Sequence, residues 1–136
     1  MATPLWHLPF MTRLTDFTSF ADAQARASSV ALWELFDGNR DKLNIAHECV
    51  LRHADGSGRA AVRVAHEGEN EIISFDAIAA AASRFAHWLE ANGVAKGDRV
   101  AVMLAPSLPY YACIFGAILR GAIAVPLFTL FGPDAL

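Results

Sequence analysis

Three side chains with metal-binding or nucleophilic chemistry, His47, Cys49 and His53, lie in one short stretch of the chain. The apolar spacing predicts a helix over residues 44–53. On that helix Cys49 and His53 share a face, whereas His47 and Cys49 are about 200° apart around the axis. A zinc site needs three or four ligands, and no other cysteine or paired histidine lies nearby in the sequence. We therefore favour two ordinary histidines on a partly buried helix over a metal site.

The other candidates for catalysis are isolated. Cys113 lies in an apolar segment without a neighbouring base, which favours a buried structural thiol over a nucleophile. Gly56-Ser57-Gly58 follows a predicted helix and precedes a predicted strand, so it directs no helix N-terminus at a phosphate, and we interpret it as a connector. Neither G-x-x-x-x-G-K-[ST] nor G-x-G-x-x-G after a strand occurs. Taken alone, these residues indicate a soluble α/β domain and no reaction.

The elements that would position these residues follow from apolar periodicity and turn signals. Helices are predicted from Asp16 to about Arg26, over 44–53, from a Ser74 cap to Asn92-Gly93, and from a Ser107 cap to Gly121. Strands are predicted over 59–66, 71–74, 99–104 and 122–128. The first two strands indicate a β-hairpin. The order strand, helix, strand from residue 99 onward indicates a βαβ unit with parallel strands.

The apolar residues of these elements predict how the core is packed. In the helix after Ser74 a core-facing stripe recurs at three- and four-residue steps, and Ala79 and Ala86 beside it allow close approach to a sheet. The stripe consists of Phe75, Ile78, Ala82, Phe85 and Leu89. In the next helix the corresponding side is Tyr111, Ile114, Phe115 and Ile118. The five-residue apolar core of strand 99–104 predicts cover on both of its faces.

Composition excludes several classes of protein. The chain has 136 residues, 54% of them apolar and 18% charged, and a net charge of −3. Such a composition excludes a disordered segment, and the absence of a basic cluster argues against a nucleic-acid partner. The two cysteines are too few for a disulfide framework, and no secretory leader is recognisable. We expect a cytoplasmic protein.

One uncharged run has the length of a membrane span. Residues 100–119 carry no formal charge, and 20 residues suffice to cross a bilayer as a helix. Pro106, Ser107 and Pro109 would interrupt such a helix, so a buried strand followed by a buried helix is favoured. The alternative is a membrane-inserted fragment, which would partition into detergent.

Four segments, in order, resemble motifs of one enzyme family. Residues 73–78 (ISFDAI) resemble a strand that ends in Ser/Thr-Tyr/Phe before a long helix. Residues 92–102 (NGVAKGDRVAV) match a "GV-x-KGDRVAV" turn and strand. Residues 120–126 (RGAIAVP) resemble a helix end, glycine-alanine, and a strand that ends in proline, and residues 128–136 (FTLFGPDAL) resemble the segment after it. The set resembles the AMP-forming acyl-CoA synthetases of the adenylate-forming superfamily, of the acetyl and medium-chain type. The helix over 44–53 is similar to one that these enzymes carry upstream.

This resemblance implies that the chain is the N-terminal part of a longer enzyme. The whole enzyme would use ATP, Mg²⁺ and CoA to convert a carboxylate into an acyl-CoA, with AMP and pyrophosphate as products. The family's phosphate-gripping loop, nucleotide-binding motifs, magnesium-binding acid and catalytic lysine are absent here. The resemblance therefore assigns no catalytic or metal-binding residue to this chain, and the segment alone is expected to be inactive.

The resemblance also places Phe128, Thr129 and Leu130 at part of the coenzyme A nucleotide site. This chain departs from the acetyl-type pattern there, because Thr129 and Leu130 stand in place of two glycines. Simple packing of Phe128 and Leu130 is the alternative.

Lys96, one of only two lysines, lies in a turn at the end of its strand away from a ligand crevice.

For the whole chain we predict an α/β fold: a partial N-terminal subdomain with a parallel βαβ unit and a β-hairpin, helices packed on the sheet. Residues 1–15 form an extended N-terminal arm, and residues 16–136 form the N-terminal part of the large adenylate-forming domain. Such a segment would expose an edge strand and apolar surface, so we expect it to form a dimer or a larger assembly. The alternative function is a self-contained, non-catalytic binding module of α/β fold.

Overall fold

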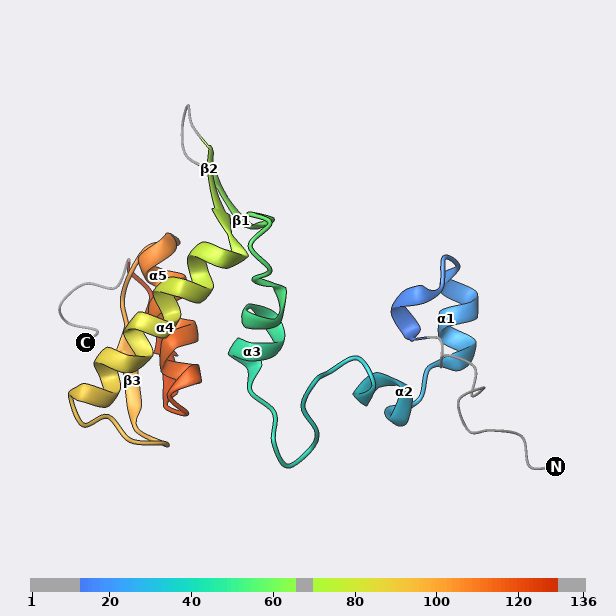
Figure 1. The fold of residues 1–136 in the computed structure, drawn as a ribbon, viewed down its shortest axis with the longest axis horizontal. Helices are drawn as coiled ribbons and strands as arrows, with labels where there is room; N and C mark the ends of the chain where they lie inside the picture. The colour runs from blue at the N-terminus through green and yellow to red at the C-terminus, as the bar shows by residue number, and fades with distance from the viewer. Residues whose placement is uncertain (1–12, 66–69, 130–136) are drawn as a thin grey trace. The chain divides into compact units, whose positions relative to one another are not determined.

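The computed structural model describes residues 13–65 and 70–129. These residues divide into two compact units, one that ends at Leu43 and one that begins at Asn44. The boundary predicted between residues 15 and 16 stays a prediction. Figure 1 shows the elements of each unit.

The N-terminal unit is built from short helices. A 3-10 helix, η2, spans Leu14–Asp16, and α1 and α2 span Phe20–Arg26 and Ser29–Trp33. The helix predicted from Asp16 therefore begins four residues later, after Ser19. The reason is local: Asp16 ends η2, where its carboxylate accepts the Arg13 N–H at 2.8 Å. The short helix α2 was not predicted; the Ser28 hydroxyl caps it by accepting the Ala31 N–H.

The second unit begins with a broken helix. The α3 helix spans Ile45–Cys49 and the 3-10 helix η3 spans Leu51–His53, so the helix predicted over 44–53 was wrong in being continuous. Val50 interrupts it with φ −129° and ψ −60°. Its side chain is only 2% exposed and joins a core cluster with Val64, Ile73 and Ile78. Burial of this β-branched side chain accompanies the loss of helical geometry.

The predicted β-hairpin is confirmed. Strands β1 (Ala60–Ala65) and β2 (Asn70–Ser74) pair antiparallel, with Val64 opposite Glu71. The register is irregular between Ala60 and Val62. The turn predicted between the strands falls mostly outside the described residues.

Strand β2 leads directly into α4, Phe75–Ala91, where the predicted helix is confirmed. The Ser74 hydroxyl accepts the Ala77 N–H at 3.1 Å, as a capping serine does. Gly93, at φ +80°, follows the last turn. Of the predicted stripe, Ile78, Ala82 and Leu89 are buried.

The parallel βαβ unit is also confirmed. It consists of β3 (Arg99–Val102), α5 (Leu108–Leu119) and β4 (Ile123–Pro126), with Arg99 paired to Ile123 and Val102 paired to Pro126. Figure 1 shows α4 lying beside α5, and these two helices share the most extensive contact in the structure. The close approach expected between α4 and a sheet is thus mainly a contact between two helices.

The structure departs from the prediction that β3 is covered on both faces. Val102 is buried, whereas Ala101, on the other face, is exposed. The neighbouring Ile123 is 52% exposed. The described residues therefore cover one face of the β3–β4 pair and leave an apolar face open.

Candidate functional site

The carboxyl edge of the β3–β4 pair brings two predicted site residues to one place. Beyond the last paired residues, the Leu127 N–H donates to the Val102 carbonyl oxygen at 2.8 Å. This bond carries β4 onward to Phe128, which is 57% exposed, and to Thr129, which is also exposed. Leu130, the third predicted residue, lies outside the described residues. In sheets with parallel strands, ligands bind outside this edge.

The α5 helix begins at the same edge. The Ser107 hydroxyl accepts the Tyr110 N–H at 3.4 Å and donates to the Ala105 carbonyl at 2.9 Å, which fixes the turn between β3 and α5. Residues 103–107 and 127–129 carry no carboxylate, imidazole or amine. The segments that follow β3 and β4 can therefore offer an aromatic ring, hydroxyls and backbone groups to a ligand. They offer no side chain that could donate or accept a proton in catalysis near neutral pH.

Lys96 lies at the opposite end of the strands, as predicted. Its turn is joined to the start of β4, because the Gly97 N–H donates to the Gly121 carbonyl at 2.9 Å. The Lys96 stem packs there as well, since its Cγ lies 3.2 Å from the position that a Cβ on Gly121 would take. Lys96 is therefore remote from the carboxyl edge along β3.

The Gly56-Ser57-Gly58 loop is held by an internal carboxylate. The Gly56 N–H donates to Asp76 Oδ1 at 2.8 Å, and the Gly58 N–H donates to Asp76 Oδ2 at 2.9 Å. Within the loop a side-chain hydrogen bond from Ser57 lowers the pKa of Asp55. Both glycines have positive φ. The loop is thus a connector fastened to the first turn of α4, and Asp76 has a second role besides its place at the positive end of the helix dipole.

The histidines and cysteines of the second unit are dispersed. The His53 ring packs against the Phe75 ring with centroids 5.2 Å apart, and Cys49 is exposed. Among residues 13–65 and 70–129 no three His, Cys, Asp or Glu side chains gather closely enough to hold a metal ion. Cys113 is half-buried, and burial raises the pKa of its thiol.

Sequence reasoning missed one buried ionic contact. Glu48 is 7% exposed and pairs with Arg52, one helical turn away, at 2.5 Å. The signal was present in the spacing, because acidic and basic residues four apart meet on a helix, and here they still meet although the helix breaks at Val50 between them. At the start of the same helix the Asn44 amide donates to the Ile118 carbonyl and ties α3 to α5.

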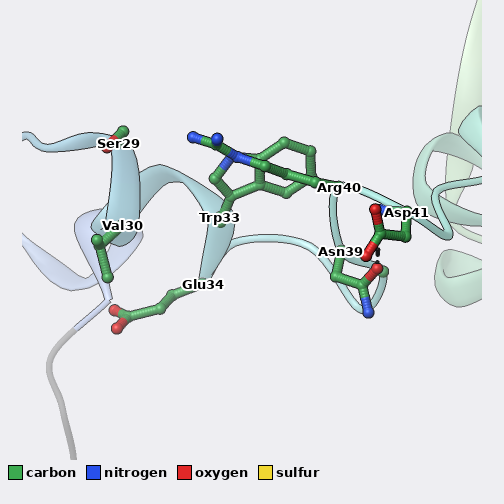
Figure 2. A pocket seen from close by; sticks show the side chains of 8 residues that line it. Ser29, Val30, Trp33, Glu34, Asn39, Arg40 and Asp41 are labelled. Carbon is green, nitrogen blue, oxygen red and sulfur yellow. Dashed lines mark hydrogen bonds between the residues drawn. The ribbon is translucent and has the colours of Figure 1, made fainter.

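The N-terminal unit holds a separate open pocket of about 520 Å³ (Figure 2). In it the Arg40 guanidinium lies over the Trp33 ring, 5.9 Å from the ring centroid. Glu34 and Asp41 add two carboxylates to the lining. The lining contains no pairing of a nucleophile with a base.

In the part of the chain that the structure describes, no helix has the length and apolar character needed to cross a membrane. The uncharged run over residues 100–119 instead holds the end of β3, a turn and α5.

Comparison with known proteins decides the family. A model of the AMP-binding enzymes matches residues 51–136. The chain belongs to this family. Among its curated relatives, the acetyl-coenzyme A synthetase of Magnetococcus marinus is 37% identical over 100 residues, covering 70% of this chain and 15% of the relative. That of Methylobacterium radiotolerans is 35% identical over 136 residues, covering 96% and 19%.

Solved structures lead to the same group of enzymes. The acyl-CoA synthetase of Brucella canis superposes with a TM-score of 0.74 at 32% identity, over 88% of this chain and 22% of that one. The predicted resemblance to the AMP-forming acyl-CoA synthetases is therefore confirmed. This family member spans less than a fifth of the length of the curated relatives described above.

Proposed function

We propose that this chain is part of an enzyme that activates a carboxylate with ATP and transfers the acyl group to coenzyme A. The first step gives an acyl-adenylate and pyrophosphate, and the second gives the acyl-CoA and AMP. The observation that carries the proposal is the match to acetyl-coenzyme A synthetases over nearly the whole chain, together with the fold shared with an acyl-CoA synthetase. A self-contained binding module has no comparable observation in its favour.

In this proposal the chain contributes a supporting layer. The segments that follow β3 and β4 at the carboxyl edge carry no basic or cationic side chain, and we assign no catalytic residue to them. Mg²⁺ would offset phosphate charge in the first step. Because the family's magnesium-binding acid has no counterpart in this sequence, the ligands of Mg²⁺ are proposed to lie in polypeptide that the relatives have and this chain does not match.

Phe128, Thr129 and Leu130 are the proposed contacts for the nucleotide part of coenzyme A. The exposed ring of Phe128 fits an adenine, because aromatic faces stack on bases. Thr129 can add a hydroxyl hydrogen bond. Because Thr129 and Leu130 stand in place of two glycines, their side chains would keep the nucleotide away from the backbone. The hydrogen bond to the nucleotide would therefore come from the Thr129 hydroxyl and not from a backbone group.

We also propose a cytoplasmic location and the two-part organisation of an arm over 1–15 and a larger domain from residue 16. By itself the 136-residue chain is expected to release no pyrophosphate when it is given ATP, Mg²⁺, CoA and a set of short carboxylates. Turnover by the chain alone would contradict the supporting role.

A chimera tests the proposal directly. This chain would replace the matching segment of the Methylobacterium radiotolerans relative, and acetate-dependent pyrophosphate release and acyl-CoA formation would be measured. We expect both activities. A folded chimera that released no pyrophosphate would contradict the proposed function.

The same chimera tests the coenzyme A contacts. Phe128→Ala should raise the KM for CoA about tenfold, since base stacking contributes about 1–3 kcal/mol. Pyrophosphate release in the absence of CoA should not change. Phe20→Ala, at an aromatic residue 81% exposed in the other unit, is the matched control. An unchanged KM for CoA in Phe128→Ala would mean that Phe128 only packs against its neighbours and does not contact CoA.

A further inference from the structure

A cavity of about 320 Å³ lies between η3 and the C-terminal halves of α4 and α5. Leu51, Ala86 and Leu119 give it apolar walls. Its polar lining comes from Ser83, His87, Glu90 and Arg120. None of these residues belongs to the carboxyl edge of the β3–β4 pair.

The topology separates this cavity from that edge. The α5 helix starts at the carboxyl end of β3 and returns the chain to the amino end of β4. Arg120, the C-cap of α5, therefore lies at the end of the parallel pair opposite to Phe128 and Thr129. A ligand in this cavity would not compete with one at the carboxyl edge.

Arg120 is the unusual member of the lining. Its side-chain Nε–H is buried and has no hydrogen-bond acceptor. Buried donors without a partner are rare in native structures and require an explanation. The end of a helix favours a positive charge, but this position still leaves the Nε–H without an acceptor. Among the residues that the structure describes, Arg120 forms no ion pair, although Glu90 lines the same cavity.

We propose that this cavity binds a small oxyanion, a short-chain carboxylate or a phosphate, anchored by Arg120. The buried Nε is closed off from solvent, so the two terminal amino groups of the guanidinium would hold the anion. These donors lie in a planar fork that suits such an anion. Ser83 and His87 stand one helical turn apart and can add donors from the α4 side. The apolar walls would accept a short alkyl chain, and Glu90 sets a preference for an anion with a single negative charge.

Butyrate and inorganic phosphate are the probes for this proposal. Each would be titrated into the full chain at constant ionic strength, with sodium chloride as the balance. The backbone amide signals of residues 51, 83, 87 and 119 would be followed by NMR. We expect saturable one-to-one binding that moves these signals, with butyrate binding more tightly than phosphate.

Three variants report on the roles of the charges. Arg120→Gln should weaken butyrate binding at least tenfold, because hydrogen bonds to charged groups are among the strong ones. Glu90→Gln should strengthen it several-fold by removing a like charge. Arg99→Gln, at an exposed arginine on β3, should change nothing.

The Glu90→Gln and Arg120→Lys variants keep the proposal testable if Arg120→Gln fails to fold. Arg120→Lys retains the charge but loses the fork, so it should bind butyrate more weakly than the unchanged chain. The proposal is overturned if neither probe gives saturable shifts, if the shifts map to residues 127–129, or if neither Arg120 variant alters binding. Each of those results leaves the chimera experiment, and thus the proposed function, unaffected.

Discussion

At the scale of single residues, Gly116 explains why α4 and α5 can lie so close together. A Cβ at this position would stand 2.7 Å from the Ala82 carbonyl oxygen and 2.9 Å from Phe85 Cδ1. The first of these atoms belongs to backbone, which cannot move aside cheaply. The apolar stripe predicted on α5 is half-buried, whereas the small residues Ala112, Gly116 and Ala117 are buried.

We therefore expect Gly116→Ala to destabilise the fold, although alanine favours a helix by roughly 1 kcal/mol over glycine. Overpacking typically costs about 1–3 kcal/mol, so the net loss should reach about 1 kcal/mol. The free energy of unfolding in urea is the measurement. Ala80→Gly, at an exposed position of α4, is the control that measures the difference in helix propensity between alanine and glycine without overpacking. A Gly116→Ala variant as stable as the unchanged chain would show that the two helices can separate freely.

The two cysteines should differ in reactivity. Burial raises the pKa of Cys113, so less of its reactive thiolate is present near neutral pH. Cys49 is exposed. With an aromatic disulfide reagent at pH 7.5, Cys49→Ser should react more slowly than Cys113→Ser, and both should react fully after unfolding. Equal rates in the two folded variants would contradict the burial of Cys113.

The same shift has a consequence for stability. Because the pKa of Cys113 is raised in the folded state, its contribution to stability is complete below the ordinary thiol pKa and is lost as the pH rises through the raised value. Urea midpoints should therefore fall less steeply with alkaline pH in Cys113→Ser than in Cys49→Ser.

At the scale of elements, Asp76 joins the glycine loop to α4. Its two carboxylate oxygens accept one N–H each from Gly56 and Gly58. Asp76→Ala should lower the free energy of unfolding by about 1–2 kcal/mol, since it removes these bonds and a favourable charge at the helix N-terminus. Hydrogen exchange at the Gly56 and Gly58 amides should become faster. Glu71→Gln, an exposed acidic residue of β2, is the control. Unchanged exchange at both glycines would mean that the loop does not need this carboxylate.

At the scale of the whole molecule, the open face of β3 and β4 supports the predicted self-association. Ala101, Met103 and Ile123 are exposed, and Ile123 is 52% exposed. Within the described residues β3 and β4 each pair on one side only. The unpaired backbone groups on the other side of each strand can pair with a strand of another molecule. Light scattering should give a mass above that of the monomer that increases with concentration.

Ile123→Lys should reduce this association, because burying a lysine at the contact is costly. Ile72→Lys, at an equally exposed isoleucine of the hairpin, should have a smaller effect if the open face is the contact. A monomer at high concentration would contradict the prediction for the unchanged chain.

The sequence by itself determined the elements whose causes are local. The Ser74 and Ser107 caps, the glycine after α4, and the hairpin and parallel pair were readable because caps, turns and apolar periods act within a few residues. The ordered motifs in turn indicated the family that the comparisons establish. They also indicated the carboxyl edge where Phe128 and Thr129 lie.

Tertiary structure decided what depends on residues distant in the chain. Val50, where the helix breaks, is buried against two strands and α4. The role of Asp76 requires a loop 18–20 residues away, and that of Gly116 requires the facing surface of α4. The exposed face of β3 and the unpaired Nε–H of Arg120 also depend on residues that are distant in the chain. In each case the deciding contact is made in space, between segments whose spacing in sequence carries no signal of it.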